Sequence, residues 1–255
     1  MPNRHLSTAI VATCLLLPTG CFQSAPVSQS PPPRPIESGG TVTHEADTIL
    51  SQETAPVESA KRADKWADLF DGKSLANWTS TQFGGEGEVT VEDGCVMLAR
   101  GDDMTGITWR GEPPAKMNYE IEVEAKRVDG NDFFCGLTFP VGDDPCSLIC
   151  GGWGGGMTGL SSLDGDDASR NETSQWINYD KDRWYKIRLR ISPEKIEAWL
   201  DDKQIVNVET AAHKIGIRPE VDPSRPLGIA TWRTMGAIRA IRLRKLDAES
   251  PHTSK

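Results

Sequence analysis

Histidine is scarce in this chain, which has four among its 255 residues. His5 lies at the extreme start, and His44 and His252 lie in polar segments near the two ends. Only His213 falls among the segments that can form strands. A Ser–His–Asp triad would have to use His213, and no nucleophile-elbow motif accompanies it. The scarcity therefore argues against a serine hydrolase and against a histidine-based zinc site.

An excess of positive charge is also missing. The chain has 28 Lys and Arg against 37 Asp and Glu, a formal net charge of −9. Proteins that bind nucleic acid carry basic patches, so nucleic acid is not an expected partner. The same balance argues against electrostatic attachment to anionic lipid.

The apolar run near the N-terminus is too short to span a bilayer, which needs roughly 20 apolar residues. It covers residues 9–17 and follows Arg4 and His5. Thr19 and Gly20 then provide the small residues that a signal peptidase requires. We therefore predict an export signal over residues 1–20 that is removed on maturation.

Cys21 follows the small pair and resembles the acylated cysteine in the lipobox of bacterial lipoproteins. The match departs at Pro18, where that pattern prefers Leu. Each buried methylene of a lipid contributes ~0.8 kcal/mol, so several acyl chains would anchor the chain firmly. We expect an exported protein, lipid-anchored in the cell envelope, that contacts membrane only through this N-terminal lipid. A plain cleaved signal is the alternative.

Three further segments follow Cys21. Residues 21–64 are rich in Ser, Pro, Thr and Glu and cannot bury a core, so they are expected to form a disordered, extended linker. Residues 65–247 carry short alternating runs separated by Gly, Pro, Asn and Asp, which is typical of an antiparallel sandwich or barrel. Residues 248–255 form a tail that is expected to be disordered. Strands are predicted over residues 89–92, 95–99, 107–110, 119–126, 133–139, 147–150, 184–191, 196–200, 204–208, 227–232 and 238–243.

Three of these strands carry complementary charges. Residues 119–126 place glutamates on one face, while residues 184–191 and 241–244 place lysine and arginine at alternate positions. Opposite charges on neighbouring strands stabilise a sheet by roughly 0.2–1 kcal/mol per pair. We therefore predict that the three strands adjoin and that these glutamates pair on a wet outer face: Glu120, Glu122 and Glu124.

Four cysteines remain in the predicted domain, and export permits them to form disulfides. Residues 133–139 can fold back through a turn at residues 141–144, which places Cys135 opposite Cys150. Cys146 would lie ~13 Å from Cys150 on a straight strand, too far to bridge. We predict a Cys135–Cys150 disulfide.

Five glycines surround Trp153 in the CGGWGGG segment over residues 150–156. Glycine removes side-chain bulk on both sides of the indole, and a ring exposed in this way suits stacking on the C–H face of a sugar. The alternative is a bulge whose Trp153 packs inward. Because no Lys-Ser/Thr follows the glycines, the segment is not a phosphate loop.

Four carboxylates fall within residues 164–172. Oxygen ligands at alternate positions suit calcium, which makes Asp164 and Asp166 the predicted metal ligands, although the spacing is not that of an EF-hand. A carboxylate pair can also perform acid–base chemistry on a glycosidic bond. A solvated acidic loop is the third interpretation. The residues concerned are Asp164, Asp166, Asp167 and Glu172.

Two Trp-Arg pairs stand at predicted strand ends, Trp109-Arg110 and Trp232-Arg233. Arginine donates in a planar fork and tryptophan offers a flat face, a combination suited to polar ring ligands. We predict that both pairs contribute to substrate binding, with surface stacking as the alternative.

The domain resembles the 3-keto-disaccharide hydrolase-like family. The opening LFDGKSLANW over residues 69–78 is similar to that family's LFDGKSL-x-x-W. Weaker similarities follow in order, so that the resemblance covers about residues 67–246. They lie at residues 91–95, 119–124, 182–188, 198–201, 227–230 and 238–243.

The resemblance implies an all-β, concanavalin A-like jelly-roll sandwich of two curved antiparallel sheets with a glycan groove. It also implies action on 3-keto-glycosides, whose ketone acidifies the neighbouring C–H and eases loss of the glycosidic oxygen. That chemistry needs a base, and often a cation to hold the enolate. The chain departs from the family pattern in its centre, where histidine is missing and residues 151–156 are glycine-rich.

Three functions follow, and carbohydrate is the expected partner of the first two. The first is a glycoside-processing hydrolase with an acidic-loop residue as acid, base or metal ligand and Arg233 or Arg110 as electrostatic stabiliser. The second is a non-catalytic carbohydrate-binding module that uses Trp153 and Trp232. The third is a structural protein of the envelope.

Overall fold

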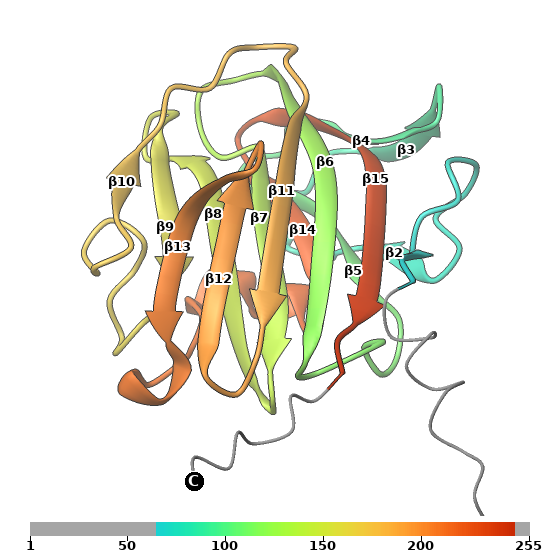
Figure 1. Cartoon of the computed structure of the whole chain (residues 1–255). Coiled ribbons are helices and arrows are strands. Elements are labelled where there is room, and N and C mark those ends of the chain that lie inside the picture. The colour runs from blue at the N-terminus through green and yellow to red at the C-terminus, as the bar shows by residue number, and fades with distance from the viewer. Residues whose placement is uncertain (1–64, 248–255) are drawn as a thin grey trace, which may run out of the picture. The chain divides into compact units, whose positions relative to one another are not determined.

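A computed structural model of the chain describes residues 65–247, which form two antiparallel β-sheets packed face to face (Figure 1). The predicted all-β sandwich is confirmed. Residues 1–64, which contain the predicted export signal, Cys21 and the predicted linker, and the predicted tail at residues 248–255 lie outside the described residues. None of the helical segments in residues 65–247 could span a lipid bilayer. Two short 3-10 turns lie among these residues, η1 (Thr210–Ala212) and η2 (Pro219–Ser224).

One sheet has eight strands: β1 (Ala67–Asp68), β3 (Val89–Glu92), β4 (Cys95–Leu98), β6 (Tyr119–Asp129), β11 (Tyr185–Ile191), β12 (Lys195–Leu200), β13 (Lys203–Glu209) and β15 (Met235–Lys245). The order across it is β13-β12-β11-β6-β15-β4-β3, and β1 pairs with β15. The C-terminal strand β15 therefore lies beside β6, far from it in sequence (Figure 1).

The other sheet has seven strands: β2 (Trp78–Ser80), β5 (Met104–Trp109), β7 (Cys135–Val141), β8 (Asp144–Gly152), β9 (Met157–Ser161), β10 (Gln175–Trp176) and β14 (Gly228–Trp232). Its order is β10-β9-β8-β7-β14-β5-β2. The glycine-rich segment therefore connects two neighbouring strands, β8 and β9.

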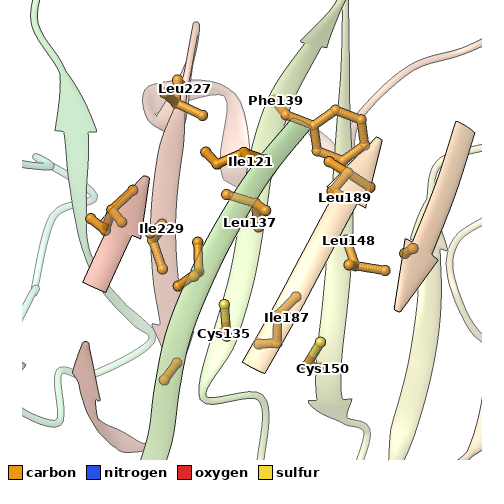
Figure 2. Close-up of a cluster of buried hydrophobic side chains, with 14 of the residues drawn as sticks. Ile121, Cys135, Leu137, Phe139, Leu148, Cys150, Ile187, Leu189, Leu227 and Ile229 are labelled. Atoms are coloured by element: carbon orange, nitrogen blue, oxygen red, sulfur yellow. The ribbon is translucent and has the colours of Figure 1, made fainter. Parts of the chain in front are cut away.

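The core lies between the sheets and follows directly from the alternation of apolar residues. Ile121 and Ile187 of the eight-stranded sheet and Leu137 and Leu148 of the seven-stranded sheet are fully buried. Figure 2 shows these side chains in the space between the strands of the two sheets. Because successive side chains of a strand point to opposite faces, the intervening residues lie on the outer surfaces.

The predicted hairpin of β7 and β8 has the expected register, but the predicted disulfide is wrong. Cys135 pairs directly with Cys150, yet both are free, fully buried thiols (Figure 2). Register alone does not bring two sulfurs to the ~2 Å of a disulfide. Burial instead raises the pKa of the Cys150 thiol to about 12, an effect partly offset by a hydrogen bond with Tyr179.

The predicted charge ladder is confirmed, although Glu120 and Glu122 are buried and only Glu124 is partly exposed. Glu120 of β6 faces Arg190 of β11 on one side and Arg244 of β15 on the other. Its carboxylate is fully buried and lies 3.3, 2.7 and 2.6 Å from guanidinium nitrogens of Arg188, Arg190 and Arg244. The long arginine side chains cover the carboxylate while their own charged ends stay near water.

Replacing Glu120 with Ala should lower the free energy of unfolding by about 3 kcal/mol, because removal of one partner leaves three arginines crowded without a counter-charge. Glu124→Ala is the matched control on the same strand. Its carboxylate is 23% exposed and pairs with Arg239, so we expect a loss below about 1 kcal/mol. Urea unfolding of the two variants measures the difference, and equal losses would contradict the importance of the buried carboxylate.

Candidate functional site

A hollow lies on the outer face of the seven-stranded sheet, away from the core between the sheets. Its apolar lining includes Met104, Phe133 and Ile149, which belong to a small apolar cluster separate from the main core. We call it the outer hollow. It is lined by Met104, Asp132, Phe133, Ser147, Ile149, Trp153, Ser161, Arg218, Glu220, Val221 and Trp232.

Arg127 holds one wall of the outer hollow from beneath. Its guanidinium, on a residue only 5% exposed, donates to the carbonyls of Gly151, Gly155 and Tyr179 at 3.1, 2.9 and 3.4 Å. It also donates to the carbonyl of Asp132 at 3.1 and 3.2 Å. Burial lowers the pKa of Arg127, and the nearby charge of Asp132 opposes that shift. One cation thus fixes backbone from three separate segments.

The glycine-rich segment owes its shape to this cation. Gly151 has a φ of +82°, and a Cβ there would lie 2.5 Å from a guanidinium nitrogen of Arg127. Glycine is therefore required at this position for both conformation and space. Trp153 follows with a φ of +47°, a region that costs a bulky residue of order 1–3 kcal/mol and persists only where its surroundings impose it.

The side chains at the rim present both apolar and polar groups. Trp153 is 41% exposed, so its ring does not pack inward, and Trp232 also lines the outer hollow. The Asp132 carboxylate accepts hydrogen bonds from the backbone N–H groups of Phe133 at 2.8 Å and Gly154 at 3.4 Å. Asp132 therefore ties the base of the hollow to the loop that carries Trp153.

Ser161 contributes a hydroxyl that lacks a protein partner. The residue is 2% exposed, and its Oγ has no hydrogen bond within residues 65–247. By contrast, Ser147 Oγ lies 2.9 Å from Thr138 Oγ1. A buried hydroxyl left unsatisfied costs roughly 1–3 kcal/mol. The outer hollow thus has a hydrogen-bonding group that a polar ligand would satisfy.

Arg218 separates the outer hollow from a second, neighbouring pocket lined by Asp164 and Asp167. It pairs with Asp167 at 2.8 Å and with Glu220 at 2.6 Å. The hydrogen bond from Arg218 lowers the pKa of Glu220. For Asp167, burial acts to raise the pKa, but hydrogen bonds from Ser169 and the charge of Arg218 outweigh it.

The predicted acidic-loop residues gather beside the outer hollow and do not line it. Asp164 Oδ2 lies 2.7 Å from Nδ1 of His213, and Glu172 Oε1 lies 3.2 Å from its Nε2. The other oxygen of Asp164 accepts from the backbone N–H of Lys214 at 2.7 Å. Asp166 is exposed on a tight backbone turn with Leu163. The loop is therefore fastened to the segment that contains His213.

Metal ligation by Asp164 and Asp166 stays a prediction. In the described part of the chain, no three His, Cys, Asp or Glu side chains gather in an arrangement that could hold a metal ion. Both oxygens of Asp164 already have protein partners, which a calcium ion would have to displace.

The two Trp-Arg pairs differ in their positions. Trp232 lines the outer hollow, whereas Arg233 points to Asp103, 2.5 Å away, outside that lining. Trp109 meets Trp78 edge-on at 5.3 Å between ring centroids, at the margin of the core. Arg110 is exposed and, like Trp109, lies outside the outer hollow.

Sequence reasoning missed Arg127, Asp132, Ser161, Arg218 and Glu220. One signal was available: Arg127 continues the odd-numbered, inward-facing positions of β6 after Ile121, Val123 and Ala125. A charge at such a position has to find buried partners. The other four residues come together only through tertiary structure.

Replacing Arg127 with Met should lower the free energy of unfolding by about 3 kcal/mol and increase protease cleavage between Gly151 and Gly156. The reason is that several buried carbonyls lose their donor, at roughly 1–3 kcal/mol each. Chemical denaturation and limited proteolysis measure the two effects. A stable variant that resists cleavage would contradict the anchoring role of Arg127.

His213 should make stability depend on pH. The hydrogen bond with Asp164, followed by the charges of Asp164 and Glu172, raises the pKa of His213 above its ordinary value of 6.5. Its contribution is therefore complete below about pH 6.5 and is lost as pH rises through the raised pKa. The pKa of Asp164 is lowered from 3.8, so the stabilising contribution of its ionised carboxylate is retained down to about pH 4.

The melting temperatures of wild type and His213→Gln should therefore differ most near pH 5–6 and converge above pH 8. Thermal unfolding across pH 4.5–9 measures this. A difference that stays constant over the whole range would contradict the assigned ion pairs.

Comparison with known proteins identifies the family of the chain. No curated protein sequence matches the chain. Among solved structures, an apo Crh5 transglycosylase matches with a TM-score of 0.51 and 14% identity, over 72% of this chain and 85% of that one. A structure described with endo-acting O-glycanases of the human gut microbiota has a TM-score of 0.50 and 12% identity, over 72% of this chain and all of that one.

At these identities the two structures show the fold alone, which is the predicted jelly roll. The sequence profile of the 3-keto-alpha-glucoside-1,2-lyase-like domain matches residues 65–244, nearly all of the described sandwich. The chain belongs to the 3-keto-alpha-glucoside-1,2-lyase-like domain family.

Proposed function

We propose that this protein binds a carbohydrate in the outer hollow and cleaves a glycosidic bond there. The observation that carries the proposal is the unpartnered, buried hydroxyl of Ser161 in a hollow rimmed by Trp153 and Trp232. A sugar has hydroxyls that can form a hydrogen bond with Ser161 and apolar C–H faces that can stack on Trp153 and Trp232. The family of the chain and the carbohydrate-active proteins that share its fold support the same ligand class.

The proposed substrate is a 3-keto-glucoside, and Asp132 is the proposed base. Glu220 is neutralised by Arg218, whereas Asp132 makes no ion pair among the described residues. Asp132 would take the proton from the carbon between the ketone and the anomeric carbon. That electron pair would first form an enolate, whose collapse would make a carbon–carbon double bond as the glycosidic C–O bond breaks. The leaving oxygen would take up the proton that Asp132 removed. Arg218 would stabilise the enolate oxygen.

Sugar binding without turnover is the second candidate function. Both carboxylates of the outer hollow have partners: Asp132 accepts from two backbone N–H groups, and Glu220 pairs with Arg218. No histidine lines the outer hollow. Export and acylation of Cys21 remain part of the proposal on the strength of the N-terminal sequence alone.

Turnover of 3-keto-α-glucosides by the purified full chain tests the function. Asp132→Asn should lower kcat/KM by about 100-fold or more, the usual contribution of a general base. Asp143→Asn, at an exposed turn, is the control and should act like wild type. Loss of activity in Asp166→Asn but not in Asp132→Asn would place the base in the acidic loop. Binding without turnover would establish the second candidate, and absence of both would contradict the proposal.

A further inference from the structure

Two large apolar side chains are exposed among the described residues, and both belong to the same corner of the seven-stranded sheet. Trp153 is 41% exposed and Trp176 is 59% exposed. Trp153 directly precedes the glycines at 154–156, and Trp176, on the edge strand β10, lies against the last of them. Trp153 rims the outer hollow, but Trp176 is not part of its lining.

The indole of Trp176 lies so close to Gly156 that any larger residue at position 156 would collide with it. A Cβ on Gly156 would lie 2.4 Å from Cε2 and 2.7 Å from Cζ2 of the indole, closer than real Cβ contacts. The φ of Gly156 is not in the left-handed region, so here glycine provides space for the ring. The backbone N–H of Ile177 donates to the carbonyl of Gly156 at 2.9 Å. The edge strand is therefore held beside Gly156, and the indole lies against the bare backbone of that glycine.

The register of the strands places Trp176 on the face that carries the outer hollow. Trp176 pairs with Met157 of β9, which pairs with Gly152 of β8. The preceding residue, Gln175, points to the opposite side, because its amide donates to the carbonyl of Ile205 in the eight-stranded sheet. Since side chains alternate along a strand, Trp176 points outward.

We infer that Trp176 forms an outer subsite that stacks against a further sugar of a glycan whose terminal residue occupies the outer hollow. The inference deepens the proposed function and rests on it. A protein interface buries about 800 Å² on each partner, far more than one ring beside glycines offers. One indole face instead matches one pyranose ring. Because the ring is already seated, stacking would cost little further ordering. The ligand is therefore an oligosaccharide chain.

Binding of glucose oligomers tests the outer subsite. The probes are unoxidised oligomers of one to six residues in α-1,4 and β-1,3 linkage, titrated into the full chain and followed by calorimetry. For wild type, affinity should rise about tenfold from the shortest bound oligomer to longer ones, the scale of one buried aromatic contact. Trp176→Ala should remove this gain and leave the affinity for the shortest oligomer unchanged.

Two further variants distinguish the contribution of an aromatic ring at position 176 from that of its position against Gly156. Trp176→Phe keeps a flat ring and should retain most of the gain with length. Gly156→Ala should displace the ring and behave like Trp176→Ala. Sugar binding that does not depend on length, or a loss in Trp176→Ala that is equal at all lengths, would overturn the outer subsite and leave the proposed function intact. Failure of wild type to bind any oligomer would also overturn the outer subsite, whereas the proposed function is decided separately by turnover of 3-keto-α-glucosides.

Discussion

The guanidinium of Arg127 is the constraint on which the candidate site depends. It starts from the eight-stranded sheet, at the end of β6, and holds carbonyls at the base of the loop that belongs to the seven-stranded sheet. Backbone carbonyls, rather than a carboxylate, satisfy its donors, so the cation acts as a clamp on main chain. Glycine loses more conformational entropy on ordering than any other residue, so a loop with five glycines is costly to hold in one conformation. The clamp allows Trp153 to keep its positive φ.

The outer faces of the two sheets carry different kinds of side chains. The eight-stranded sheet carries the charge ladder around Glu120 on its outer face, where paired side chains leave little bare backbone. On the outer face of the seven-stranded sheet, small residues leave parts of the backbone uncovered by side chains. A Cβ on Gly228, for example, would lie 2.5 Å from the carbonyl of Ser224, so η2 packs against bare backbone there. That approach brings Glu220 and Val221 to the rim of the outer hollow.

Strands with clear alternation could be predicted from the sequence because burial on one face imposes period two. The β7–β8 register could be predicted as well, since the turn at residues 141–144 leaves little choice. β1, β2, β9 and β10 were missed. β9 begins directly after glycines and β10 has two residues, so neither shows a repeating pattern.

The candidate site was only half predictable. Trp153 and Trp232 were recognised because a tryptophan among glycines, or beside an arginine at a strand end, is a local signal in the sequence. The acidic loop was given the catalytic role on spacing alone, and the fold instead ties Asp164 and Glu172 to His213. Asp132 and Ser161 have no local signal, because burial and missing partners are properties of the folded chain.

A crystal structure of the protein with a bound oligosaccharide would show whether the outer hollow is the sugar site. We expect a sugar ring between Trp153 and Trp232 with one hydroxyl within hydrogen-bond distance of Ser161 Oγ. A sugar bound in the pocket of Asp164 and Asp167, or on the outer face of the eight-stranded sheet, with the outer hollow filled only by water, would contradict it.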